Sequence, residues 1–163
     1  MKQNADFLLY PAAAAVVFAA DQSFKKAVKK KIPADGMVRV KDFLILSNTK
    51  NGGFACNAFE KDRKLVRTVT AAATGTVAGV LGTTLALTGN GEKKLRKAGL
   101  SLLTGGALGN LADRLRDGYV TDFVTFAKGP EKLTQLAFNT ADFSIFAGAI
   151  LIVIDEILEK SDD

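Results

Sequence analysis

The sequence contains no histidine and only one cysteine, Cys56. Without histidine, neither a Ser-His-Asp nor a Cys-His catalytic site can be assembled. The single cysteine excludes an intramolecular disulfide framework, and carboxylates with a nearby Arg but no His argue against a zinc protease. An enzyme of this composition must therefore use carboxylate, lysine or other metal chemistry. At its own position, we expect Cys56 to pack as a small hydrophobic residue.

Charged residues are missing from two long stretches, residues 7–20 and 68–89. The first, FLLYPAAAAVVFAA, predicts a short first helix that is retained rather than cleaved. The second is rich in Thr, Ala and Gly and predicts a membrane span in which three glycines allow neighbouring helices to approach closely, Gly75, Gly79 and Gly82. Two further helices are expected over residues 98–115 and 133–158, and the length of the chain fits one domain.

The mean hydropathy of +0.15 is low for a chain of this kind. Four membrane spans of about 20 residues each would take roughly half of the chain. The low value comes from Lys-rich connections and from Thr, Gly and Ala inside the expected spans. A soluble helical bundle therefore remains an alternative to a membrane protein.

The formal net charge is +5, and the basic residues are concentrated in the connections between the apolar stretches. They do not form one continuous face interleaved with aromatic residues, so we expect no nucleic acid partner and favour anionic membrane lipid. Residues 25–32, KKAVKKKI, either lie on a headgroup surface or form a solvated helix end.

Residues between the first two helices carry β-forming patterns. A turn at residues 33–36 precedes an expected strand over 37–46, and a second short strand is expected over 53–59. These segments predict two short strands between the first and second helices.

Two aspartates, Asp122 and Asp142, lie in separate blocks of small and apolar residues. A carboxylate in such surroundings is costly unless it is paired, hydrogen-bonded or used in chemistry. Gly118 can end the third helix, and residues 119–126 suit an extended segment before the chain returns in the fourth helix. We therefore interpret the two aspartates as a catalytic pair, and structural acids that pair with Arg or Lys remain the alternative.

The other polar residues of these blocks have helical spacing. Asn110, Asp113 and Arg114 fall at i, i+3 and i+4, which places an amide, a carboxylate and a guanidinium on one helix face. Asn139 likewise precedes Asp142 by three positions.

The pattern GGALGN-x-x-DR-x-x-x-GYV-x-DF, followed by FN-x-AD-x-x-I-x-x-G, resembles the bacterial lipoprotein signal peptidase family, signal peptidase II. Members of that family are four-helix integral membrane aspartic proteases, which cut prolipoproteins just before a lipid-modified cysteine. The resemblance implies that Asp122 and Asp142 are the catalytic aspartates. It also implies that the remaining polar positions of the site are Asn110, Asp113, Arg114 and Asn139.

Two further elements are similar to the same family. Asp21-Gln22-x-x-Lys25 resembles its DQ-x-x-K element, and the segment 51–55, NGGFA, resembles an element beside the active site. Cys56 departs from the family, where Phe or Leu is usual. The resemblance thus adds Asn51, Gly53, Asp21 and Lys25 as binding or supporting residues, although Asp21 and Lys25 also fit a surface i,i+4 pair.

Together with the resemblance, these patterns predict a mainly α protein: a four-helix transmembrane bundle with a small extracytoplasmic β-platform between helices 1 and 2, forming a single domain over residues 1–163. The resemblance implies a monomeric aspartic endopeptidase without metal or cofactor, in the bacterial cytoplasmic (inner) membrane. Its active site faces the extracytoplasmic side, and its partners are prolipoprotein signal peptides that carry a diacylglyceryl cysteine.

Two observations leave room for other interpretations. The first long loop, which the family places outside, carries more Lys and Arg than the loop expected in the cytoplasm, in tension with the positive-inside rule. A non-catalytic membrane scaffold of the same architecture is the alternative function. It predicts that Arg or Lys neutralises both Asp122 and Asp142.

Overall fold

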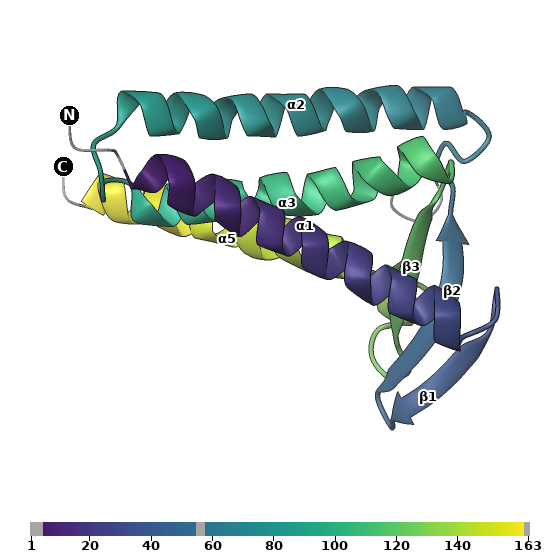
Figure 1. Ribbon diagram of the computed structural model, residues 1–163. Coiled ribbons are helices and arrows are strands. Elements are labelled where there is room, and N and C mark those ends of the chain that lie inside the picture. The colour runs from purple at the N-terminus through teal and green to yellow at the C-terminus, as the bar shows by residue number, and fades with distance from the viewer. Residues whose placement is uncertain (1–4, 55–57, 162–163) are drawn as a thin grey trace.

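The structure, a computed structural model, describes residues 5–54 and 58–161. The expected packing of Cys56 lies outside the described residues. The chain is mainly helical, with long helices α1 (Asp6–Lys31), α2 (Arg63–Leu87), α3 (Lys94–Arg116) and α5 (Thr140–Ser161), and a short α4 (Glu131–Thr134). A small sheet lies at one end of these helices (Figure 1). The prediction of a mainly α protein with a small β element is therefore confirmed.

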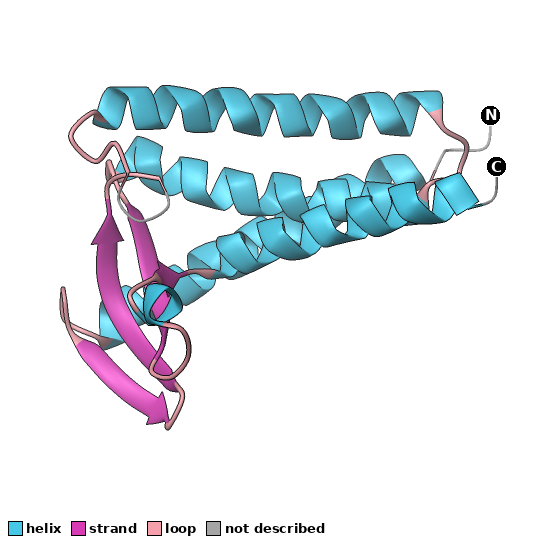
Figure 2. Cartoon of the chain, turned by 180° about the vertical axis from the view of Figure 1, so that it is seen from behind, coloured by secondary structure: helices cyan, strands magenta, loops and turns pink. Residues whose placement is uncertain are grey.

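The sheet is antiparallel, with strand order β1 (Met37–Lys41), β2 (Leu44–Asn51), β3 (Val120–Phe126) and β4 (Ala137–Phe138). Only β1 and β2 come from the α1–α2 connection, and β3 and β4 come from the α3–α5 connection, on the same side of the helices (Figure 2). Two strands are therefore present between helices 1 and 2, as predicted, and the sheet is larger than predicted because the α3–α5 connection adds β3 and β4. Because β3 is a central strand of the sheet, the sheet itself positions Asp122.

Several predicted boundaries differ from the structure. The strand expected over 37–46 is a hairpin that turns at residues 42–43, because the apolar alternation continues through the turn and hides it. Residues 58–59 of the strand expected over 53–59 lie in a turn. The fourth helix begins at Thr140 rather than at residue 133, since residues 137–138 pair with β3.

Helix α1 is longer than predicted and includes the basic stretch as its last turns. Lysines at the carboxyl end of a helix interact favourably with the helix dipole. Ile32 is extended and is followed by Pro33, which disfavours a helical conformation in the preceding residue and so ends the helix. Asp21 and Lys25 are consequently mid-helix residues rather than the end of the first helix.

Helix α3 is the central helix, because it packs against α1, α2 and α5. Glycines make this packing close: a Cβ added to Gly99 would lie 2.6 Å from the carbonyl oxygen of Gly148 on α5. A Cβ on Gly105 would lie 2.5 Å from the carbonyl oxygen of Ala14 on α1. Small residues at such crossings are typical of helices that pack within membranes.

The glycines of α2 do not have this role. Cβ atoms added to Gly75, Gly79 and Gly82 would meet nothing within 4 Å. The prediction that these glycines allow close helix approach is therefore wrong, because no neighbouring helix lies against them in the described part of the chain. Helices α1 and α2 are long and apolar enough to cross a membrane, and most of the residues in their apolar windows are not buried within the chain.

Candidate active site

A cavity of about 440 Å³ opens between α2, α3, α5 and the sheet. Both aspartates line it, Asp122 from the middle of β3 and Asp142 from the first turn of α5. The amide and guanidinium side chains that also line it belong to Asn51, Asn110, Arg114 and Asn139. The remaining wall is mostly apolar, with Val69 and Ala73 from α2 and Ile145 from α5. The cavity therefore combines a few convergent polar groups with an apolar wall, as binding sites do.

Asp122 is held by two side-chain amides. Asn51 donates from Nδ2 to one carboxylate oxygen at 3.0 Å, and Asn139 donates from Nδ2 to the other at 2.6 Å. The side chain is buried, with 3 % of the residue exposed. Burial raises the pKa of Asp122 to about 6, the negative charge of Asp142 adds to this rise, and the two amide donors oppose it.

Asp142 is fixed by a capping box at the start of α5. Asn139 precedes the helix, and its side-chain oxygen accepts from the Asp142 backbone N–H at 3.0 Å. The Asp142 carboxylate in turn accepts from the Asn139 backbone N–H at 3.0 Å and from Nδ2 of Asn110 at 2.9 Å. This reciprocal pattern satisfies free donors at the helix start and fixes the carboxylate.

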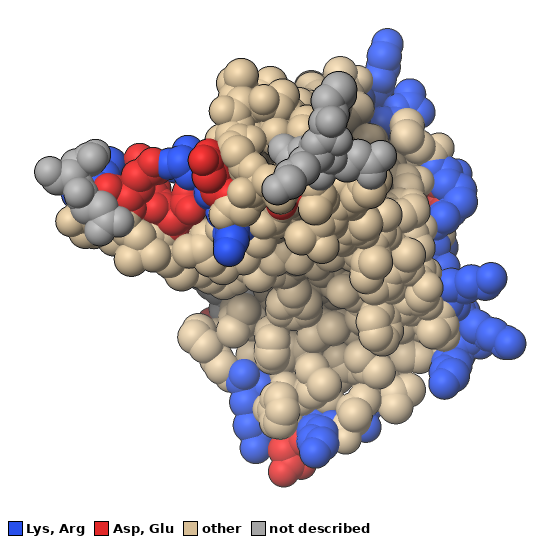
Figure 3. Space-filling view, turned by 60° about the vertical axis from the view of Figure 1, so that its left-hand side comes forward, with Lys and Arg blue, Asp and Glu red and all other residues tan. Residues whose placement is uncertain are grey.

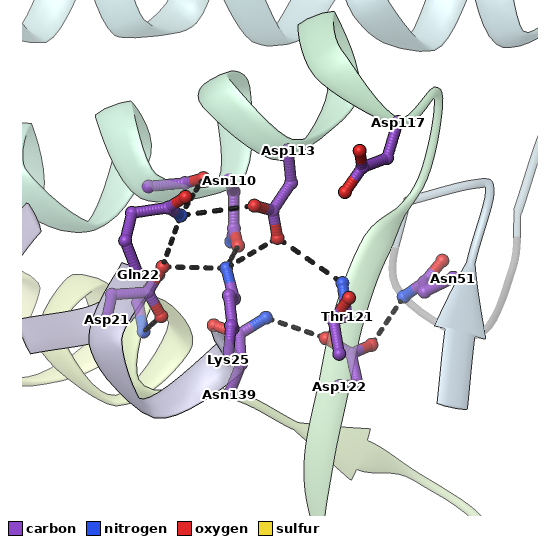
Figure 4. Close-up of polar contacts among 12 residues, drawn as sticks. Asp21, Gln22, Lys25, Asn51, Asn110, Asp113, Asp117, Thr121, Asp122 and Asn139 are labelled. Carbon is purple, nitrogen blue, oxygen red and sulfur yellow. Dashed lines mark hydrogen bonds and ion pairs between the residues drawn. The ribbon is translucent and has the colours of Figure 1, made fainter. Parts of the chain in front are cut away.

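Behind the cavity lies a buried ion cluster centred on Lys25 (Figure 4). Its Nζ lies 2.7 Å from Asp21 and 3.0 Å from Asp113, and it donates to Oδ1 of Asn110 at 3.0 Å. Because the Asn110 oxygen faces Lys25, the amide nitrogen of the same side chain is directed to Asp142. Lys25 therefore acts on the site through Asn110.

The two acids of this cluster hold the backbone that carries the aspartates. Asp21 accepts from the Ala141 backbone N–H at 2.9 Å, and Asp113 accepts from the Thr121 backbone N–H at 3.3 Å. Ala141 and Thr121 each immediately precede a cavity aspartate in sequence. Asp21 thus fixes the start of α5, and Asp113 fixes β3.

Arg114 lines the cavity from the last turn of α3. Its Nη2 donates to the Gly53 carbonyl at 2.6 Å, and the Gly53 backbone N–H donates to Oδ1 of Asn51 at 3.1 Å. The buried Nε of Arg114 has no hydrogen-bond partner among the described residues. Among the residues that the structure describes, no Arg or Lys nitrogen lies within 4.0 Å of a carboxylate oxygen of Asp122 or Asp142.

The structure thus brings the predicted residues together in two layers: one lines the cavity, and the other is the buried cluster around Lys25 and the contacts behind the cavity wall. Six line the cavity, as given above, and Gly53 contacts two of them. The helical face predicted for Asn110, Asp113 and Arg114 is divided, because Asp113 contacts Lys25 instead of lining the cavity. Asp21 and Lys25 are not a surface pair, since both are buried.

Sequence reasoning missed Gln22. Its Nε2 donates to Asp113 at 3.1 Å and to the Gly109 carbonyl at 3.3 Å, so it joins α1 to α3 beside the ion cluster. The i,i+3 spacing between Gln22 and Lys25 was a usable signal for this position. No sequence pattern indicated that α2 contributes apolar residues to the cavity wall. Within residues 5–54 and 58–161, no group of three or more His, Cys, Asp or Glu residues is arranged to hold a metal ion.

Comparison with known proteins relates the chain to lipoprotein signal peptidases. The model of the signal peptidase (SPase) II family matches residues 13–158. The lipoprotein signal peptidase of Tolumonas auensis is 32% identical over 143 residues, which cover 88% of this chain and 86% of that protein. The lipoprotein signal peptidase of Shewanella amazonensis is 49% identical over 63 residues, 39% of this chain and 36% of that protein.

Solved structures share the fold. A bacterial membrane enzyme determined by the in meso method at 2.3 Å resolution aligns with a TM-score of 0.80 at 23% identity, covering 100% of this chain and 93% of that one. A second, determined at 1.9 Å resolution, aligns with a TM-score of 0.69 at 24% identity, covering 94% and 93%.

Proposed function

The chain belongs to the signal peptidase (SPase) II family and removes signal peptides from prolipoproteins; from this premise we propose that it is an aspartic endopeptidase whose catalytic pair is Asp122 and Asp142. The observation that carries the proposal is their shared cavity, in which both carboxylates are oriented by amide donors. The same arrangement weakens the scaffold alternative, because no described Arg or Lys forms an ion pair with either acid.

The pair would act by sharing one proton. Ionising both carboxylates of one buried cavity costs free energy, because their negative charges repel each other. Burial is the main cause that raises the pKa of Asp122 to about 6, and the charge of Asp142 is the second. The ionised member activates a water molecule, and the protonated member polarises the scissile carbonyl. The two apparent pKa values belong to the pair rather than to either residue.

The remaining cavity residues position the carboxylates and the peptide. Asn51, Asn110 and Asn139 hold the carboxylate oxygens in place. Arg114 has a buried N–H without a described partner beside the cavity, so its planar donor group can bind carbonyl oxygens of the substrate backbone.

We further propose that all four long helices cross the bacterial cytoplasmic membrane. Large apolar side chains are exposed on all four, including Leu8 and Val16 on α1, Val69 and Val80 on α2, Leu108 and Leu115 on α3, and Phe146 and Val153 on α5. This surface also argues against a soluble bundle. Because α3 is enclosed by the other helices, it can carry more polar and small residues and lower the mean hydropathy.

In this arrangement the cavity lies at the sheet end, which we place on the extracytoplasmic side. The substrate class is a prolipoprotein signal peptide whose cysteine carries a diacylglyceryl group. The apolar wall of α2 and α5 suits such a lipid-modified segment. The enzyme acts as a monomer, since one chain supplies every residue assigned to the site.

The test is cleavage of a lipid-modified prolipoprotein peptide by the purified protein. Asp122→Asn and Asp142→Asn should each abolish cleavage, because an amide can neither accept the proton of water nor donate one as a carboxylic acid does. Asp42→Asn, an exposed change in the β1–β2 turn, is the matched control and should cleave at the wild-type rate. Substantial activity in either dyad variant removes that aspartate from the mechanism.

A further inference from the structure

The net positive charge of the chain comes from one segment, residues 21–67. Residues 21–67 contain 12 Lys and Arg against 5 Asp and Glu, while the rest of the chain contains 10 and 12. This segment forms the end of α1, the β1–β2 hairpin and the start of α2, all at the sheet end. Figure 3 shows Lys and Arg along one edge of the molecule, and acids mixed with bases on the projection at the opposite side. The net positive charge therefore lies at the same end as the active site.

At this end, a hollow of about 300 Å³ lies between α1 and the end of α3. Its lining residues are Gln22, Lys25, Lys26, Lys29, Arg116 and Asp117. The hollow thus brings four cationic side chains around one lining acid. It is separate from the cavity that holds the two aspartates.

The cations of the hollow are not all neutralised. Lys25 is paired with buried acids, and Asp117 is shared between Arg116 at 3.1 Å and Lys29 at 2.7 Å. Hydrogen bonds from Arg116 and from Lys29 lower the pKa of Asp117. Lys26 is exposed and forms no ion pair within the described part of the chain. A ligand anion would therefore find one uncommitted ammonium and the spare donor hydrogens of Lys29.

The position of the hollow identifies the kind of anion. It lies on the last turns of α1, where this apolar helix becomes basic, which is the level at which a spanning helix reaches the headgroups. Phosphate diesters of anionic lipids are the abundant negative groups at that depth, and basic residues next to a span attract them.

We propose that this hollow binds the phosphate headgroup of an anionic phospholipid, in the leaflet toward which the active site opens. Lys26 and Lys29 are the direct contacts, and Lys30 adds charge at the rim. The inference rests on the proposed membrane placement, and not on the assignment of the catalytic pair. Because Lys25 lines both the hollow and the buried cluster, a lipid bound there lies directly beside the residue that orients Asn110.

The test measures lipid retention by the full chain. Protein purified in detergent is incubated with equimolar phosphatidylglycerol and phosphatidylcholine, separated by size exclusion, and its retained lipid is quantified by mass spectrometry. We expect a several-fold enrichment of phosphatidylglycerol. Lys26→Gln should lower the enrichment about fivefold, and Lys26→Arg should keep it. Lys64→Gln, an exposed change at the start of α2 outside the hollow, is the matched control and should change it much less.

Each outcome decides the proposal. Equal retention of the two lipids by the wild type, or equal losses in Lys26→Gln and Lys64→Gln, overturns it. Full displacement of the lipid by millimolar glycerol 1-phosphate would identify a site for soluble phosphate instead of a membrane lipid. Asp122→Asn should retain the lipid preference while it loses cleavage, so the lipid site and the catalytic pair are tested separately.

Discussion

The side-chain amide of Asn139 donates to Asp122 at 2.6 Å, and Asn139 is at the same time the capping residue of the helix that carries Asp142. One side chain is therefore bonded to both carboxylate-bearing segments, β3 and α5. Since Asn139 is fully buried, it cannot reorient without breaking one of these contacts. It sets how the two acids lie relative to each other.

Changes at Asn139 should separate these two contributions. Asn139→Ala removes the cap and the Asp122 contact, so the helix start should lose about 1 kcal/mol and activity should fall on the order of 100-fold. Asn139→Ser can still cap the helix but cannot reach Asp122. It should therefore recover thermal stability without recovering cleavage. Full activity in the Ser variant would show that the bond to Asp122 is dispensable.

Lys25 should be far more important for stability than Lys29, although the two are four positions apart on α1. Lys25→Met leaves Asp21 and Asp113 buried without their cation, which should destabilise the fold by about 3–5 kcal/mol. Lys29→Met breaks a partly exposed pair with Asp117, which is worth at most about 1 kcal/mol. Thermal unfolding of both variants in the same detergent measures the difference. Similar unfolding temperatures would contradict the assignment of a buried cluster.

Glycine substitutions in α3 and α2 should have opposite effects. A Cβ at Gly109 would lie 2.5 Å from a carboxylate oxygen of Asp21, so Gly109→Ala should displace Asp21 and reduce both stability and activity. Gly79→Ala meets open space on α2 and should be neutral or stabilising by up to about 1 kcal/mol. Equal effects of the two substitutions on the unfolding temperature would refute this packing.

The glycines also show how far the sequence could predict the structure. The spacing of Gly75, Gly79 and Gly82 is a helix-packing pattern, but spacing does not reveal which face meets a neighbour, and here that face is open. The extended segment around Asp122 was predicted because it is short, apolar and bounded by Gly118. Its partner β2 could not be identified from the same pattern, since strand pairing depends on contacts between distant segments.

For the site, fixed spacings identified residues but not their layers. Asn110 and Asp113 share a helical face and both contact Lys25, yet only Asn110 also reaches Asp142. Which of them lines the cavity depends on the position of α1, and this is set by packing at Gly105 and Gly109. Gln22 was passed over because its spacing to Lys25 does not reveal that its partners lie on α3.

Arg114→Lys tests whether geometry or charge matters at that position. The Lys variant keeps the positive charge but loses the planar donor group that reaches the Gly53 carbonyl and faces the cavity. Cleavage should fall at least tenfold while the unfolding temperature changes little. If the Lys variant cleaves as well as the wild type, charge alone suffices and the fork of donors has no role.

The pH dependence of stability should reveal the state of Asp122. Its pKa is raised from 3.8 to about 6 by burial and by the charge of Asp142, so between these values the folded chain binds more protons at this residue than the unfolded chain does. The contribution of Asp122 to the free energy of unfolding should therefore decrease as pH rises from about 4 to 6, in total on the order of 3 kcal/mol. Asp122→Asn removes this titration. As pH rises through this window, the unfolding temperature of the wild type should therefore fall relative to that of the variant. A difference that stays constant from pH 4 to pH 7 would mean that Asp122 ionises as an ordinary carboxyl, and the proton shared by the catalytic pair would then have to reside elsewhere.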